Sequence, residues 1–192
     1  MKLHQISIKE LELQTIELEN HPMKWLFEIE EGIPTSEEHK DQIFALNIKA
    51  AKYLWDYEGK TRIGKFYPNI GEYFKDVIQY QDLERNEKEL KKWLFNLGIP
   101  FKSKVFLSIQ PDSGFILTWK MVIKYCSNLF LGYDLILFDK SVNWGLFYHH
   151  DEIYHFGRNR IYNSEIEGQK VLRDSKLISE WKSKIELNKS KK

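Results

Sequence analysis

The chain contains a single cysteine, Cys126, among its 192 residues. One thiol excludes an internal disulfide and a metal site built from several cysteines. We therefore expect a protein of a reducing compartment, the cytoplasm. The stretch after Met1, KLHQISIKELEL, lacks the unbroken apolar core of a signal peptide. The longest apolar runs, such as residues 129–138, are too short and interrupted to cross a bilayer, so we expect no membrane segment.

An excess of charge of either sign is also missing. The sequence has 29 basic and 28 acidic residues, for a net charge of +1. This balance creates no overall field toward nucleic acid. Arg158 and Arg160, together with Lys140 and the lysine-rich C-terminal end, could form a basic patch beside aromatic residues. Solvated charges beside a sheet edge are the simpler interpretation, so we do not expect a nucleic-acid partner.

The familiar catalytic motifs are absent as well. The sequence has no GxxxxGK[ST], GxGxxG, GxSxG, HExxH or CxxC. Cys126 lies on an apolar helical stripe, which indicates a buried hydrophobe and not a nucleophile. Asp134 and Asp139 bracket an apolar strand, but no acidic-x-Lys triple follows, as a metal-dependent nuclease would require. We expect no cofactor, and the absence of these motifs favours a protein that is not an enzyme.

Aromatic residues, in contrast, are abundant, at 15% of the chain. Large rings usually fill a core. An aromatic surface is also typical of a protein-binding site, where aromatic and arginine side chains supply much of the affinity.

Apolar residues at helical spacing predict several helices. The clearest runs from Thr35 to Gly59, where Thr35 and Glu38 form a capping box. Another follows Thr118, with Cys126 and Phe130 on its apolar stripe. Residues 1–20 fit either alternating strands or a helix from about Ile8, and we favour the helix. Further helices are expected over 22–31, from Asn69 to about Tyr80, from Asp82 to about Leu97, and from Asp174 or Ser175 onward.

Alternating or wholly apolar runs predict strands over 105–110, 134–139, 144–149 and 153–156. This order predicts an α+β fold, in which N-terminal helices pack with a mostly antiparallel C-terminal sheet and a closing C-terminal helix. We expect a single domain over residues 1–192. Its parts would be a mainly helical half (1–100), a sheet-containing half (101–162), and a terminal helix with a lysine-rich tail (163–192).

The stretch YHHDEIYHFGR, residues 148–158, carries three of the six histidines of the chain. If residues 149–152 form the turn of a hairpin, Tyr148 pairs with Ile153 and Leu146 with His155. Alternation along the strands then places His155 on the same face as Leu146 and Trp144. The three imidazoles do not converge in this register, whereas a metal centre needs three or four ligand atoms around one point. We therefore favour a polar hairpin tip and assign no metal ligand.

An acid/base role for His150 or His155 remains an alternative, because imidazole titrates near neutral pH. With no catalytic residue assigned, the residues expected to form a binding surface are Trp144, Tyr148, His149, His150, Asp151, Glu152, His155, Arg158 and Arg160.

Several apolar landmarks carry a resemblance that spans most of the chain. They are KWLF (24–27), AAKYLW (50–55), TWKMVIKYCSNLFL (118–131) and DLILFD (134–139). Together they resemble a family of short bacterial proteins of unknown function, which implies a fold and a bacterial origin but no mechanism. The C-terminal half is also similar to small immunity proteins that neutralise bacterial toxins. We therefore expect a non-enzymatic module that binds a protein partner, immunity-like by the second resemblance. The alternative is a metal-dependent or acid/base hydrolase that uses the 149–155 cluster.

Overall fold

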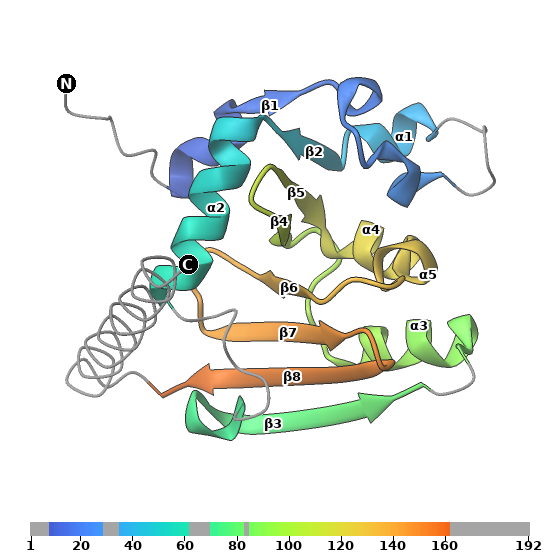
Figure 1. The fold of residues 1–192 in the computed structure, drawn as a ribbon. Helices are drawn as coiled ribbons and strands as arrows, with labels where there is room; N and C mark the ends of the chain where they lie inside the picture. The colour runs from blue at the N-terminus through green and yellow to red at the C-terminus, as the bar shows by residue number, and fades with distance from the viewer. Residues whose placement is uncertain (1–7, 29–34, 62–69, 83–84, 162–192) are drawn as a thin grey trace, which may run out of the picture. The chain divides into compact units, whose positions relative to one another are not determined.

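The computed structural model describes residues 8–28, 35–61, 70–82 and 85–161. The chain divides into two compact units, Met1–Arg160 and Ile161–Lys192. All the elements below belong to the first unit (Figure 1).

Eight strands among the described residues form one sheet in which every neighbouring pair is antiparallel. Their order across the sheet is β1-β2-β5-β4-β6-β7-β8-β3. Short turns join β4 to β5, β6 to β7 and β7 to β8, whereas α4 and α5 lie between β5 and β6, and both edges of the sheet come from the N-terminal half. The strands are β1 (Thr15–Ile16), β2 (Ile43–Leu46), β3 (Phe74–Gln81), β4 (Lys104–Gln110), β5 (Ser113–Thr118), β6 (Leu135–Phe138), β7 (Trp144–His149) and β8 (Ile153–Arg160).

Helices cover both faces of this sheet. One face packs against α2, and the other packs against α3, α4 and α5. The α-helices are α1 (Glu37–Lys40), α2 (Ile48–Thr61), α3 (Glu87–Asn96), α4 (Trp119–Lys124) and α5 (Cys126–Leu129). Short 3₁₀ helices are η1 (Ile8–Leu13), η2 (Leu18–Asn20), η3 (Lys24–Phe27) and η4 (Ile70–Glu72). None of the helices in the described ranges is long and apolar enough to cross a membrane.

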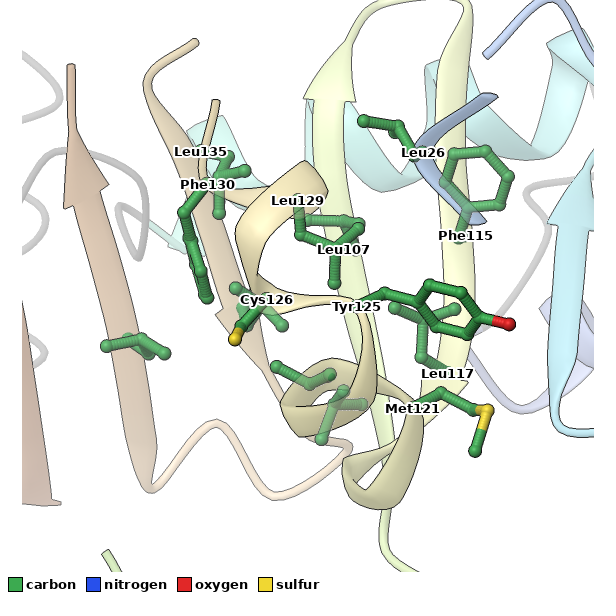
Figure 2. Close-up of a cluster of buried hydrophobic side chains, with 14 of the residues drawn as sticks. Leu26, Leu107, Phe115, Leu117, Met121, Tyr125, Cys126, Leu129, Phe130 and Leu135 are labelled. Carbon is green, nitrogen blue, oxygen red and sulfur yellow. The ribbon is translucent and has the colours of Figure 1, made fainter. Parts of the chain in front are cut away.

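The central strands read as continuous apolar runs because they are buried on both faces. On β4, Leu107 belongs to the cluster under α3–α5, while its neighbour Phe106 belongs to the cluster under α2. Figure 2 shows the first cluster, in which Leu107 and Leu117 lie close to the α4–α5 side chains. Cys126 is fully buried there, and burial raises the pKa of its thiol to about 11. The prediction that Cys126 is a buried hydrophobe is therefore confirmed.

The predicted α+β class with an antiparallel sheet is confirmed. The strands predicted over 105–110, 134–139, 144–149 and 153–156 correspond to β4, β6, β7 and β8. The helix predicted after Thr118 is present in two pieces, α4 and α5, which Tyr125 separates. The expected closing helix falls outside the described residues.

The long helix predicted over residues 35–59 was wrong in its middle. The run Ile43–Leu46 forms strand β2, which divides α1 from α2. It pairs with β5 on one side and β1 on the other. The apolar residues of this run are spaced as in a helix, which is why a helix was predicted. Pairing within a sheet that is buried on both faces outweighs this local preference for a helix.

The helix predicted from Asn69 to Tyr80 was also wrong. Residues Phe74–Gln81 form edge strand β3, which pairs with β8 along its whole length. Its side chains are mostly exposed, so the segment lacks the alternation of a half-buried strand. The segment is a strand because it pairs with β8, and a local sequence pattern carries no information about that pairing.

The N-terminal helices are shorter than predicted. The segment from Ile8 forms the 3₁₀ helix η1 and then the two-residue strand β1, so both patterns noted there are partly present. The helix expected over 22–31 is reduced to η3, and residues 29–34 lie outside the described part. Helix α3 begins later than predicted, because Asn86 and not Asp82 is its N-cap.

Candidate metal centre

The hairpin between β7 and β8 sets the geometry of the candidate site. The pairs are His149 with Ile153, Tyr148 with Tyr154, and Phe147 with His155. The predicted register was therefore wrong by one residue, and the loop has three residues, His150 to Glu152. Glu152 has a φ of 60°, the left-handed conformation that typically closes a three-residue hairpin loop.

This register changes the face on which His155 lies. His155 pairs with Phe147, whose side chain belongs to the α2 side of the sheet. Leu146, by contrast, belongs to the cluster under α3–α5, together with Tyr148 and Phe156. The prediction that His155 shares a face with Trp144 and Leu146 is therefore wrong, because one residue of shift inverts every side chain of a strand.

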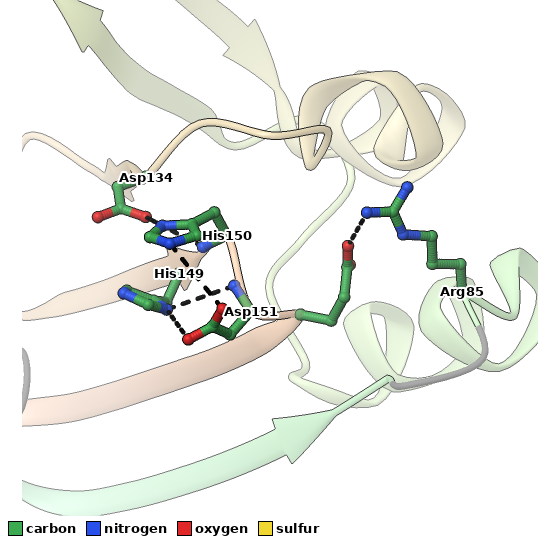
Figure 3. Close-up of polar contacts among 6 residues, drawn as sticks. Arg85, Asp134, His149, His150 and Asp151 are labelled. Atoms are coloured by element: carbon green, nitrogen blue, oxygen red, sulfur yellow. Dashed lines mark hydrogen bonds and ion pairs between the residues drawn. The ribbon is translucent and has the colours of Figure 1, made fainter.

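The prediction that the three imidazoles lie apart is wrong for His149 and His150. The rings of His149 and His150 lie with their centroids 4.1 Å apart at the end of β7. Asp134, just before β6, reaches the same point (Figure 3). One ligand atom from each of Asp134, His149 and His150 lies within 4.8 Å of the other two.

Hydrogen bonds hold the Asp134 carboxylate against the turn. Its Oδ1 accepts the backbone N–H of His150 at 3.0 Å and lies 2.7 Å from Nδ1 of the His150 ring. Partial burial acts to raise the pKa of Asp134, but the hydrogen bonds from His150 hold that pKa below its usual value. The same carboxylate raises the pKa of His150. The end of β7 is thereby tied to the segment that leads into β6.

Asp151 offers a second carboxylate to the same pair of rings. Its Oδ2 lies 3.3 Å from Nδ1 of His149, and its Oδ1 lies 3.9 Å from Nε2 of His150. His149 is the least exposed of these side chains, whereas Asp134, His150 and Asp151 are open to solvent. The arrangement can therefore present two imidazoles and two carboxylates to an ion that enters from solvent.

The other histidine of the stretch, His155, stands apart from this cluster. It is buried, and desolvation together with the nearby His149 lowers the pKa of its imidazole. Glu152 turns to the opposite side of the loop, where its carboxylate forms an ion pair with Arg85 at 2.7 Å. Of the predicted polar residues, the structure therefore brings together His149, His150 and Asp151.

The predicted aromatic members of the binding surface are part of the core. Tyr148 is fully buried, and burial raises the pKa of its hydroxyl to about 12. Trp144 is half-buried between Trp119 and Phe156, with ring centroids 5.9 and 5.8 Å away.

The suggested basic patch is largely engaged in internal contacts. Arg158 donates to the carbonyl of Leu97 at 2.7 Å, and its guanidinium lies over the Phe156 ring. Lys140 pairs with Glu12. The backbone of Arg160 bonds to Asn143, and the lysine-rich end lies outside the described residues.

Sequence reasoning missed Asp134 as a member of the site. It was interpreted only as an acid that marks the end of a strand, which it also does. A signal was available, because β6 and β7 were predicted neighbours in an antiparallel meander. The start of one such strand lies beside the end of the next, so this pattern places Asp134 and His149 at the same edge, an inference that the sequence analysis did not draw.

The fold and the site define an antiparallel α+β protein with a histidine–aspartate cluster at one strand end. Comparison of the chain with protein-family models, with curated proteins and with solved structures found no match in any of the three.

Proposed function

We propose that this protein binds a divalent transition-metal ion through Asp134, His149 and His150. The observation that supports the proposal is the convergence of one ligand atom from each side chain within 4.8 Å. Asp151 contacts both rings and can act as a further ligand. Rotations of these side chains would bring the ligand atoms to the distance of 2.0–2.2 Å from an ion that is typical of zinc–nitrogen and zinc–oxygen bonds.

The donor set indicates the class of ion. Two imidazoles with carboxylates suit Zn²⁺, Ni²⁺, Cu²⁺ or Co²⁺, whereas Mg²⁺ and Ca²⁺ prefer sites made of oxygen alone. The bond between His150 and Asp134 also resembles the carboxylate–histidine pairing that orients metal ligands in many sites. Asp134 therefore serves either as a ligand itself or as the partner that orients His150.

This proposal departs from the sequence analysis, which expected a protein partner and assigned no metal ligand. The protein partner, and the immunity-like role with it, stay predictions from the sequence. The alternative hydrolase would use the same ion, with water completing its coordination, and the metal supplies the Lewis acidity in that case.

Titration calorimetry with ZnCl₂, on protein without an affinity tag, tests the proposal. We expect one ion per chain, and we expect the His149→Ala/His150→Ala double variant to lose this binding. Asp134→Asn should weaken it roughly 10- to 100-fold, the usual cost of losing a partner of a metal-bound histidine. His4→Ala removes one imidazole at a distant point of the sequence and serves as the matched control. Equal zinc affinity in the double variant and the parent would refute the proposal.

A further inference from the structure

A cavity of about 170 Å³ lies beside the β7–β8 loop, on the other side from the histidine–aspartate cluster. It is open to solvent on one side and is lined by the start of α3, by α5 with the residues after it, and by the loop residue Glu152. An apolar cavity of about 150 Å³ holds one benzene molecule, so this one fits a small organic ligand. Its lining residues are Asp82, Arg85, Glu87, Leu90, Cys126, Ser127, Phe130, Leu131, Glu152 and Tyr154.

The floor of the cavity is apolar and aromatic. Phe130 and Tyr154 meet edge to face there, with ring centroids 5.1 Å apart. Leu90 and Cys126 are buried beside them. Burial raises the pKa of the Cys126 thiol to about 11, so at neutral pH this side chain contributes a neutral surface and not a thiolate.

The rim, in contrast, is charged and mainly acidic. Three carboxylates, from Asp82, Glu87 and Glu152, line the cavity with one guanidinium, from Arg85. The Glu152 side chain is 11% exposed, whereas its ion-pair partner Arg85 is 61% exposed. The carboxylate therefore lies in the buried part of the cavity lining, and the guanidinium reaches it from solvent. The dashed line that ends on Arg85 in Figure 3 marks this ion pair.

Both members of this ion pair have unusual backbone conformations. Arg85 has a φ of 51° and Glu152 a φ of 60°, in the left-handed region that costs free energy for any residue with a Cβ atom. Glycine is the residue that a hairpin loop of this type favours at the position of Glu152. The backbone carbonyl of Glu152 also accepts the N–H of Asp82 at 3.0 Å, which ties the loop to β3. Backbone strain of this kind concentrates at ligand-binding sites.

We infer that this cavity binds a small organic cation, a primary ammonium group on a short aromatic or apolar body. The ammonium replaces the Arg85 guanidinium at the Glu152 carboxylate, and the body rests on the Phe130 and Tyr154 rings. Aromatic faces attract cations, and the attraction strengthens where water is excluded. The side chain of Arg85 closes the empty cavity and moves into solvent when the ligand enters.

The charges around the cavity decide against an anionic ligand. An anion would gain the Arg85 guanidinium but would meet three carboxylates. Two of them, on Asp82 and Glu152, belong to buried residues, and the third, on Glu87, pairs with Lys91. Burial next to like charges is costly, whereas a cation gains from the two buried carboxylates, Asp82 and Glu152. An uncharged ligand of the same shape would interact only with the apolar and aromatic residues of the cavity floor.

Three probes of one shape test the charge preference on the full-length chain. These are benzylammonium, phenylacetate and benzyl alcohol, titrated while amide and methyl NMR signals of the cavity residues are recorded. We expect saturable shifts at Leu90 and Leu131 with benzylammonium, and at least tenfold weaker binding of the other two probes. Stronger binding of phenylacetate, or the absence of binding by benzylammonium at millimolar concentration, would overturn the inference.

Two variants test the exchange of Arg85 for the ligand. Glu152→Gln keeps the shape of the side chain and should weaken benzylammonium binding roughly 10-fold or more, because a charged hydrogen-bond partner is lost. Arg85→Ala removes the competing guanidinium and should strengthen binding by about 2- to 5-fold, the range expected for an exposed ion pair. Weaker binding in Arg85→Ala would contradict the exchange. The His149→Ala/His150→Ala variant should bind benzylammonium like the parent, which separates this site from the proposed metal centre.

Discussion

Gly157 on β8 lies against an aromatic ring that leaves no space for a side chain. A Cβ atom at this position would stand 2.3 Å from Cδ2 of Phe74, which is buried at the start of β3. Glycine in a strand often marks such a close approach. The packing of edge strand β3 on β8 therefore depends on the missing side chain.

We expect Gly157→Ala to lower the free energy of unfolding by about 1–3 kcal/mol, because the added methyl group overpacks this contact. Gly71→Ala is the matched control, since a Cβ atom there has nothing within 4 Å. Urea unfolding of the two variants measures the difference. Equal stability of the two would show that Phe74 moves aside without cost.

His21 is buried in the core with its ring 4.3 Å from that of Phe115. Its Nδ1 accepts the backbone N–H of Met23 at 3.1 Å, so the folded protein needs the neutral imidazole. Burial accordingly lowers the pKa of His21 below its ordinary value of 6.5. The unfolded chain therefore binds this proton more readily than the folded protein.

Stability contributed by His21 is fully present above pH 6.5 and is lost as the pH falls toward the lowered pKa of the folded state. We expect His21→Asn, whose Oδ1 can accept the same N–H, to be less stable at pH 7 but to lose less stability between pH 7 and pH 5.5. Urea unfolding at several pH values gives both slopes. The two proteins differ only at residue 21, so the difference between their slopes isolates His21, and identical slopes would contradict this role of His21.

At the scale of elements, helix α3 begins at a well-defined cap. The Asn86 Oδ1 accepts the backbone N–H of Glu89 at 3.3 Å, and the Asp82 Oδ1 accepts that of Asn86 at 3.0 Å. These two bonds fix the first turn of the helix, which also forms one wall of the cavity. An asparagine N-cap satisfies a backbone donor that the helix leaves unpaired.

We expect Asn86→Ala to lower the free energy of unfolding by about 1 kcal/mol, the usual cost of losing an N-cap. Lys88→Ala, an exposed substitution within the same helix, is the control and should change stability by less than about 0.5 kcal/mol. Thermal unfolding of both variants measures this. A loss in Lys88→Ala as large as that in Asn86→Ala would contradict the role of the cap.

The elements also show where sequence patterns suffice. Strands β4, β6, β7 and β8 could be predicted because their apolar runs are short and turn residues separate them. Strands β2 and β3 could not, because each owes its conformation to a partner strand far along the chain. The run Ile43–Leu46 fits a helix by spacing alone, and only its pairing with β5 selects the strand.

The hairpin at the candidate site illustrates the same limit on a smaller scale. Its existence followed from alternation and a polar tip, but a loop of three residues and one of four fit that pattern equally. The choice rests on Glu152, a residue with no special preference for the left-handed conformation that it adopts. The register, and with it the face on which His155 lies, was therefore not predictable from the sequence.

At the scale of the whole molecule, one antiparallel sheet with helices on both faces explains where the polar side chains gather. The central strands are buried on both sides, so the polar groups next to them lie at strand ends and in loops. One such end carries the histidine–aspartate cluster, and the other side of the same loop carries the acidic cavity. The three-residue loop thus contributes residues both to the proposed metal centre and to the proposed cation-binding cavity.

The most direct test of the metal proposal is a crystal structure of the protein grown with zinc, with anomalous data collected at the zinc edge. We predict a peak bonded to His149 and His150 at about 2.0–2.2 Å, with an oxygen of Asp134 or Asp151 as a further ligand. His155 should not contact the ion. A fully occupied zinc ion held by other side chains, or a map with no peak beside His149 and His150, would contradict the proposal.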